Sequence, residues 1–281
     1  MIDKMNSMKG IKVMRKNKIC LSLLICIILI ITVTSCKKDE GASKILKESS
    51  DNFMKADSLK TSIDVDTLFE TVSDATGVKM FFELENTTNP VAGHAVGKSV
   101  FEFSGMKNSG EVEVYQLEED GEMVTYSRIN DMWIKETGIN YNDSYGIKSE
   151  FIKPEKKPGK ILLKKETTKV NDKECYELTG YMTGKDAENI FDISVINQLS
   201  GIDTPDTEDI ARSTIPFVIN IYKDSMLPAK IYIDMTDALD GVYEKMDENT
   251  SVSKFTITIK YGDYNNVKDI IVPEEVKQAA Q

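Results

Sequence analysis

Histidine, cysteine and tryptophan are scarce in this 281-residue chain, which has one His, four Cys and one Trp. A Ser-His-Asp or Cys-His catalytic site, or a zinc site containing histidine, would have to use His94. That residue follows Asn89-Pro90 in a turn-rich stretch, where we expect a solvated loop position. The sequence therefore predicts a protein that is not an enzyme, with no catalytic residue, no metal site and no cofactor.

The cysteines allow no internal disulfide in the folded part of the chain. Cys20 and Cys26 lie in an apolar N-terminal run, and Cys36 follows that run. Cys175 is then alone in the rest of the sequence and has no partner there. Because it sits in an alternating segment, we expect a half-buried apolar side chain rather than a reactive thiol.

Positive charge is in deficit, with 35 Lys and Arg against 46 Asp and Glu and a formal net charge of −11. Residues 1–35 hold six of the basic residues and one acid, so the remainder carries 29 basic and 45 acidic residues, or −16. Nucleic-acid binding needs clustered Lys and Arg, so no nucleic-acid partner is predicted. The acidic balance also disfavours tight contact with anionic lipid headgroups and favours solubility.

One long apolar run is present, over residues 19–33, directly after a basic stretch. A bilayer-spanning helix needs about 20 apolar residues, and this run is shorter. Its length is typical of the hydrophobic region of a signal peptide. We therefore predict a signal peptide over residues 1–35, with translation starting at Met1 or Met14. A signal anchor that keeps its helix is the alternative.

The junction after this run is Val33-Thr34-Ser35-Cys36, which resembles the lipobox of bacterial lipoproteins. Such a junction has an aliphatic residue and two small residues before the cysteine that is acylated. Lipid attachment at Cys36, as with palmitate, would hold the protein at the cell membrane on its extracytoplasmic face, since each buried methylene contributes roughly 0.8 kcal/mol. Residues 36–42 then form the acylated cysteine and tether, and residues 43–281 form one folded domain.

Alternation of apolar and polar residues predicts β-strands through most of this domain. The expected strands cover residues 61–70, 78–86, 99–104, 111–117, 122–129, 132–135, 161–170, 174–182, 217–222, 229–235 and 251–264. Turn residues at Asp120-Gly121, Asn130-Asp131 and Asn171-Asp172 predict hairpins between neighbouring strands. Strands connected in this way form an antiparallel sheet.

Helical periodicity is confined to short segments. Residues 43–57 predict one amphipathic helix, and residues 187–199 predict a second, with Thr183 and Asp186 as its capping pair. A short C-terminal helix is expected after Pro273. Residues 138–160 predict a long loop or lid, and the polar residues between Met235 and Ser251 predict another loop. The predicted fold class is α+β, with about nine to ten strands and two main helices.

Four segments carry a resemblance to a known group of proteins: residues 112–115 (VEVY), 131–135 (DMWIK), 221–230 (IYKDSMLPAK) and 264–276 (YNNVKDIIVPEEV). Their order resembles the LolA/LppX-like superfamily of bacterial lipoproteins, especially uncharacterised Firmicutes lipoproteins with a LolA-like domain. The resemblance implies a curved antiparallel half-barrel with the helices packed on its concave face. It also implies a lipid-binding domain over residues 43–281 and no catalytic residues.

Two functions follow from these observations. The first is a binding module that takes a lipid or other acylated ligand into an apolar groove. Methionines repack easily around flexible ligands, so Met80, Met123, Met182 and Met235 are candidate lining residues, with plain core positions as the alternative. The second is a non-enzymatic protein-interaction or envelope-sensing module with a closed groove and an unknown protein partner.

Two further motifs have simpler explanations. Residues 92–99 (AGHAVGKS) fit a loose phosphate-binding loop, but the following residues predict a strand where such a loop requires a helix. Asp203, Asp206, Glu208 and Asp209 offer oxygen ligands without the spacing of a calcium-binding EF-hand loop. A solvated acidic loop is therefore expected there.

Overall fold

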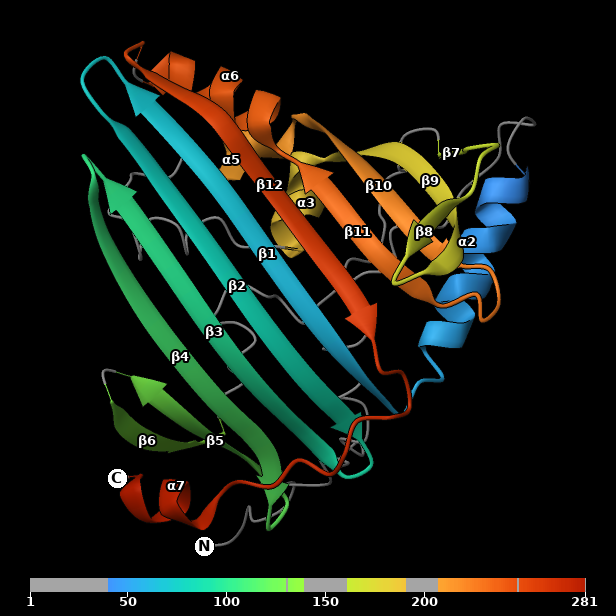
Figure 1. Cartoon of the computed structure of the whole chain (residues 1–281), viewed down its shortest axis with the longest axis vertical. Helices are drawn as coiled ribbons and strands as arrows, with labels where there is room; N and C mark the ends of the chain where they lie inside the picture. The colour runs from blue at the N-terminus through green and yellow to red at the C-terminus, as the bar shows by residue number, and fades with distance from the viewer. Residues whose placement is uncertain (1–39, 130, 139–160, 191–206, 247, 281) are drawn as a thin grey trace, which may run out of the picture.

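A computed structural model describes residues 40–129, 131–138, 161–190, 207–246 and 248–280 (Figure 1). In the described residues, twelve strands form one sheet in which every pairing is antiparallel. The strands are β1 Ser58–Thr71, β2 Ala75–Thr88, β3 Val91–Phe103, β4 Met106–Glu119, β5 Glu122–Ile129, β6 Met132–Thr137, β7 Leu162–Leu163, β8 Thr168–Val170, β9 Lys173–Thr183, β10 Thr214–Tyr222, β11 Pro228–Asp234 and β12 Thr250–Gly262.

The strand order is β6-β5-β4-β3-β2-β1-β12-β11-β10-β9-β7, and β8 also pairs with β9. The chain starts in the middle of the sheet with β1 and runs outward to β6, which we call the N-terminal half-sheet (β1–β6). It then passes to the other edge and returns inward until β12 pairs with β1. We call these later strands the C-terminal half-sheet (β7–β12). The edge strands do not meet, so the sheet is open, as a curved α+β half-barrel requires (Figure 1).

The expected number of about nine to ten strands was wrong, since the described residues form twelve. One segment explains part of the difference. Residues 161–170 were predicted to form one strand, but β7 and β8 are two short strands that pair with different parts of β9. Alternation of apolar and polar side chains does not show where the hydrogen-bonded pairing of a strand is interrupted, because both pieces keep the same period of two.

The hairpin turns follow the predicted chemistry where they are described. Asp120 and Gly121 have φ of 50° and 85°, and Asn171 and Asp172 have φ of 50° and 61°. Positive φ at both central residues is the property of the two-residue turn that matches the twist of paired strands. These turns fix the register of β4 with β5 and of β8 with β9.

The described helices are α2 Glu40–Phe53, α3 Gly184–Ile190, α5 Thr207–Ala211, α6 Thr236–Met246 and α7 Glu274–Ala279. Helix α2 confirms the predicted N-terminal helix, and α7 confirms the one after Pro273. The predicted capping pair of α3 is also confirmed, because the Thr183 hydroxyl donates to Asp186 at 2.8 Å and accepts from its N–H at 3.2 Å. Most of the second predicted helix, from residue 191 onward, lies outside the described residues.

Helix α6 corrects the expectation of a polar loop after Met235. Leu239, Val242 and Tyr243 are buried on one face, although Asp240 and Gly241 interrupt this short apolar pattern in the sequence. Asp234 accepts a hydrogen bond from the Thr236 N–H at 3.1 Å where the helix begins. The Thr236 hydroxyl accepts from the Phe255 N–H at 2.9 Å, which ties this end of the helix to β12.

The main core lies on one face of the sheet, which we call the inner face. Phe53 of α2 meets Tyr261 of β12 edge-on with ring centroids 5.8 Å apart, and Tyr243 of α6 meets Phe69 of β1 at 5.4 Å. Helices α2 and α6 therefore pack on the inner face. The short helix α7 covers part of the opposite, outer face, where its Val276 joins a small cluster with residues of β4 and β5.

Candidate ligand-binding faces of the sheet

The inner face of the N-terminal half-sheet carries a strip of apolar and small side chains. In the registers of β2, β3 and β4, Gly97 lies between Phe82 and Val112, and Ala95 lies one step along β3. Phe101 continues the same face toward the end of β3. We call Phe82, Ala95, Gly97, Phe101 and Val112 the inner strip.

The inner strip is only partly covered. On this face, α6 packs mainly on β12, α3 on β9 and β10, and α2 on β7. Phe255 and Ile257 of β12 are accordingly buried, whereas Phe82, Ala95 and Phe101 keep part of their surface exposed. The described helices therefore cover the C-terminal half-sheet much more completely than the inner strip.

Gly97 makes room for its neighbours in the strip. A Cβ atom at this position would lie 2.5 Å from the ring of Phe82 and 2.7 Å from Cγ1 of Val112. No real side chain tolerates such contacts, so the Phe82 ring lies where a side chain on β3 would otherwise stand. A glycine in a strand often marks a close approach of this kind.

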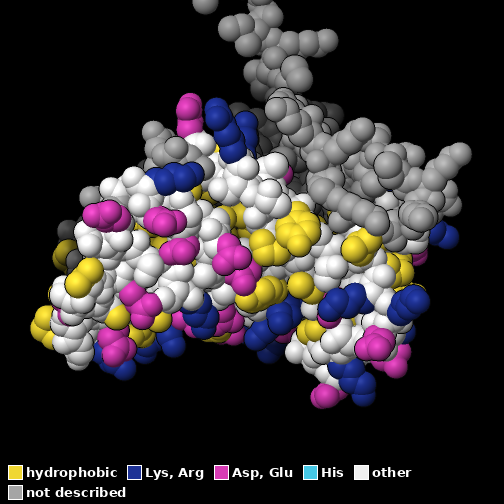
Figure 2. Space-filling model, turned by 90° about the horizontal axis from the view of Figure 1, so that it is seen from above, with side chains coloured by type: hydrophobic (Ala, Val, Ile, Leu, Met, Phe, Trp, Pro, Cys, Tyr) yellow, Lys and Arg dark blue, Asp and Glu magenta, His cyan; other side chains and the backbone are white. Residues whose placement is uncertain are grey.

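The strip leads to an exposed apolar end of the sheet. Phe101 and Phe103 stack with centroids 6.5 Å apart, and Phe103, Met106 and Val72 are 38%, 68% and 87% exposed. The Ser104 hydroxyl donates to Asp74, which links the β3–β4 turn to the β1–β2 turn. Seen from above, apolar patches lie between acidic and basic side chains (Figure 2).

The four candidate methionines do not form one group. Met80, Met182 and Met235 are buried in the main core, at 2%, 2% and 0% exposure. Met123 lies apart from them near the start of β5, half-buried and opposite Glu118. Three of them therefore lie in the main core but at separate places, Met80 on β2, Met182 on β9 and Met235 directly after β11, and their part in binding a ligand stays a prediction.

His94 is not in a solvated loop, as the sequence suggested. It lies within β3, its ring stacks on Tyr115 with centroids 4.2 Å apart, and its Nε2 is 3.1 Å from Oε1 of Glu113. The Tyr115 hydroxyl donates to the same carboxylate at 3.0 Å. Burial, together with Glu113, raises the pKa of Tyr115 to about 12. The prediction failed because the glycines around His94 resemble loop residues, while pairing on both sides holds them in the sheet.

Other predicted positions have mixed outcomes. Residues 92–99 are strand throughout, which excludes the loop-to-helix geometry of a phosphate-binding loop. Cys175 is fully buried beside Tyr222 and Ala229, and burial raises the pKa of its thiol. Val33, Thr34, Ser35 and Cys36 lie outside the described residues, as do Asp203 and Asp206.

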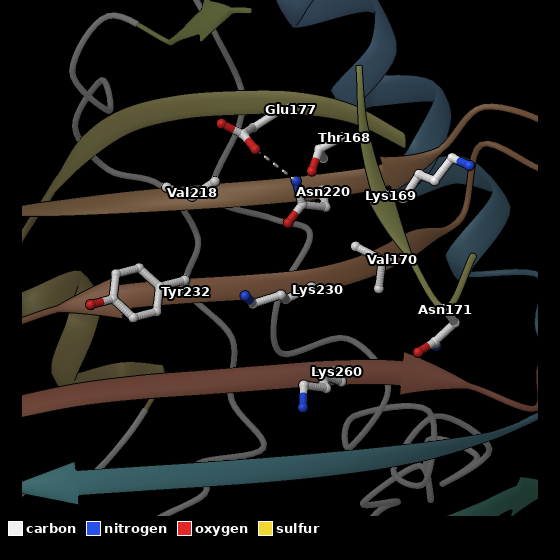
Figure 3. A pocket seen from close by; sticks show the side chains of 10 residues that line it. All are labelled: Thr168, Lys169, Val170, Asn171, Glu177, Val218, Asn220, Lys230, Tyr232 and Lys260. Atoms are coloured by element: carbon white, nitrogen blue, oxygen red, sulfur yellow. Dashed lines mark hydrogen bonds between the residues drawn. The ribbon is translucent and has the colours of Figure 1, made fainter. Parts of the chain in front are cut away.

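A cavity of about 530 Å³ opens on the outer face of the C-terminal half-sheet. Ten residues line it, mostly polar ones, and they come from β8, β9, β10, β11 and β12 and the β8–β9 turn (Figure 3). Lys230 and Lys260 project from neighbouring strands, and Lys169 comes from β8. Sequence reasoning missed this cavity, because its residues are far apart in the chain and only the strand order brings them together.

A metal site and a membrane-spanning helix each need a feature that the described residues do not provide. Among them, no three His, Cys, Asp or Glu side chains come together as a metal ion would require. None of the helices described is long and apolar enough to cross a membrane.

Solved structures similar to this chain include two mycobacterial proteins, one of them the lipoprotein LppX. LppX from Mycobacterium tuberculosis is 12% identical with a TM-score of 0.46, covering 81% of this chain and 97% of that chain. LprF from Mycobacterium bovis is also 12% identical with a TM-score of 0.46, covering 83% and 96%. At this identity and overlap, the two similarities transfer neither a family nor a ligand to this chain.

No curated protein matches the chain. A family model does match it, over residues 41–281, which includes nearly every described residue. The chain belongs to this family, which is a family of unknown function (DUF6612).

Proposed function

We propose that this protein is a non-enzymatic lipoprotein that binds a lipid or other acylated ligand on its inner strip. The inner strip itself is the observation that supports this proposal. Phe82, Ala95 and Phe101 join the main core yet keep part of their surface exposed, and the strip leads to an exposed apolar end. An acyl chain laid along it would remove apolar surface from water.

The energetics favour such a ligand. Burial of apolar surface contributes roughly 25 cal/mol per Å², or about 0.8 kcal/mol for each buried methylene group. Because Phe82 and Val112 fill the space over Gly97, the strip is a shallow apolar surface, and a flexible chain could lie on these two side chains and on Ala95. The strip offers no charged group, which fits an acyl chain better than a polar substrate.

The proposal includes an anchor at the extracytoplasmic side of the cell membrane. Acylation of Cys36 after removal of residues 1–35 would leave only a few residues before α2 begins at Glu40. A tether this short would keep the domain close to the lipid surface. Metabolic labelling with a palmitate analogue tests the anchor: Cys36→Ala should lose the label and leave the membrane fraction, and a variant that keeps both contradicts it.

A matched pair of substitutions tests the inner strip. Ala95 and Val96 are neighbours in β3, but Ala95 faces inward while Val96 is 41% exposed on the outer face. In the chain from residue 37 onward, which contains every described element, Ala95→Phe should lower uptake of a fluorescent fatty acid about tenfold, or about 1.4 kcal/mol. Val96→Phe adds the same ring to the other face and should leave uptake unchanged.

Native mass spectrometry of the purified chain adds an independent measurement. A stoichiometric acyl lipid that is lost on denaturation supports the proposal and identifies the class of lipid. A protein that carries no lipid, and whose fatty-acid uptake is absent or equal in both variants, contradicts it. The exposed apolar residues Val72 and Met106 would then favour the second function, a protein-interaction or sensing module.

A further inference from the structure

The outer-face cavity is a second site, separate from the inner strip. Side chains in a strand alternate between the two faces of a sheet. Lys230, Tyr232 and Lys260 alternate with the core residues Ile231, Ile233 and Ile259, so they point away from the core. Any ligand in this cavity is therefore separated from the inner strip by the sheet itself.

Two lysines lie side by side in this cavity, on neighbouring strands (Figure 3). Lys230 and Lys260 are directly opposite in the antiparallel register of β11 and β12. Like charges in this position repel, and such a pair destabilises a sheet unless something compensates. Within the described part of the chain, neither ammonium group is within ion-pair distance of a carboxylate, and that of Lys230 lies 6.0 Å above the ring of Tyr232.

The carboxylates nearby are already engaged. Glu177, which lines the cavity, forms an ion pair with Lys164 and accepts a hydrogen bond from Asn220 at 3.4 Å (Figure 3). Asp234 accepts from the Tyr232 hydroxyl at 3.5 Å and from the Thr236 N–H. Neither acid is within ion-pair distance of Lys230 or Lys260.

The concentration of positive charge here stands out against the whole chain, whose formal net charge is −11. Lys169 on β8 also lines the cavity, but its ammonium group points away from Lys230 and Lys260 (Figure 3). A volume of about 530 Å³ is within the range of pockets that hold small molecules. Around the lysines, Thr168, Asn171 and Asn220 supply groups that can donate or accept hydrogen bonds.

We infer that this cavity binds a ligand through a phosphate group, held between Lys230 and Lys260. Lysine is a compact cation with rotatable donors and is a common phosphate-binding residue. A phosphate between the two ammonium groups would replace their repulsion with two attractions. The surrounding hydroxyl and amide groups suit a phosphate attached to a polar body. The phosphate could belong to a soluble molecule or to a lipid headgroup.

Calorimetric titration of the full chain in a neutral detergent, with inorganic pyrophosphate as the probe, tests this inference. We expect saturable binding that weakens about tenfold or more in the double variant Lys230→Gln/Lys260→Gln, because both charge-assisted contacts are lost. The matched control is Lys79→Gln/Lys98→Gln, which removes two outer-face lysines from β2 and β3. The control should bind as the unmodified chain does.

Thermal unfolding distinguishes a lost site from a lost fold. Removing the repulsion between Lys230 and Lys260 should leave the melting temperature of the double variant unchanged or higher. A pelleting assay with phosphatidylglycerol vesicles, against phosphatidylcholine vesicles, distinguishes the source of the phosphate. If the double variant loses binding to phosphatidylglycerol vesicles and the control variant keeps it, the phosphate belongs to a lipid headgroup. If the chain binds pyrophosphate but not these vesicles, the phosphate belongs to a soluble ligand.

The inference is overturned if neither probe binds at concentrations up to about 10 mM, which corresponds to a negligible affinity. It is equally overturned if a folded double variant binds either probe as tightly as the control does. Because the inner strip is on the other face, fatty-acid uptake should be the same in all these variants. The two proposals can therefore fail independently.

Discussion

The two halves of the sheet share one ladder of antiparallel pairings, yet their inner faces are built differently. In the C-terminal half-sheet most inner residues are large and aliphatic or aromatic, and four helices contribute to their burial. The buried set includes Phe217, Ile219, Ile231, Ile233, Ile257 and Ile259. In the N-terminal half-sheet, β1 and β2 also supply large residues to the main core, but the inner face of β3 presents Gly93, Ala95, Gly97 and Ser99 before Phe101.

This difference separates scaffold from site. Large side chains packed against helices hold one half in a single arrangement, because close-packed interiors resist deformation. Small residues in the other half leave surface that a ligand can cover without displacing part of the core. A protein that takes up an apolar ligand needs both a packed scaffold and an accessible apolar surface, since a fully packed sheet has no place for the ligand.

The largest expected effect compares two phenylalanines. Phe53 is 1% exposed and packs edge-on against Tyr261 and Tyr264, so Phe53→Ala should lower the free energy of unfolding by about 3–5 kcal/mol. Phe82 in the inner strip is only partly buried, so Phe82→Ala should cost roughly half as much. Denaturant unfolding measures both values. Equal losses would show that the two halves are packed alike.

A smaller effect compares two glycines. Gly97→Ala places a Cβ against Phe82 and Val112 and should destabilise the protein by about 1–3 kcal/mol. Gly262 in β12 has no heavy atom within 4 Å of an added Cβ, so Gly262→Ala should change stability by less than about 0.5 kcal/mol. Thermal unfolding of the two variants under the same conditions tests this. A neutral Gly97→Ala would mean that Phe82 moves freely out of the strip.

The smallest effect concerns pH and the outer face of the N-terminal half-sheet. The pKa of Tyr115 is raised from 10.0 to about 12, first by burial and then by Glu113. At pH values between these two, the unfolded chain has lost this proton and the folded chain keeps it, so stability should fall from pH 10 to 12. Tyr115→Phe removes the titrating group and should flatten the fall. An equally steep fall in that variant would assign the effect to other groups.

Much of the fold could be predicted from the sequence, but less of the site. Alternation in residues 61–70 and 78–86 identified β1 and β2, and the residue types at Asp120-Gly121 identified a hairpin. These signals are local, because a strand's faces and a turn's backbone angles depend on neighbouring residues. Helix α6 was missed, since its short apolar face is recognisable only once β12 lies beneath it.

Local chemistry in the sequence therefore determined the antiparallel strands, their turns and the capping of α3, each of which depends on a few adjacent residues. The tertiary structure alone decided which strands became neighbours and which faces the helices covered. Pairing of β11 with β12 placed Lys230 opposite Lys260, and the small residues Ala95 and Gly97 of β3 became part of an apolar strip only when β2 and β4 flanked them. Contacts between residues far apart in a chain depend on the whole packed arrangement, which no local pattern encodes.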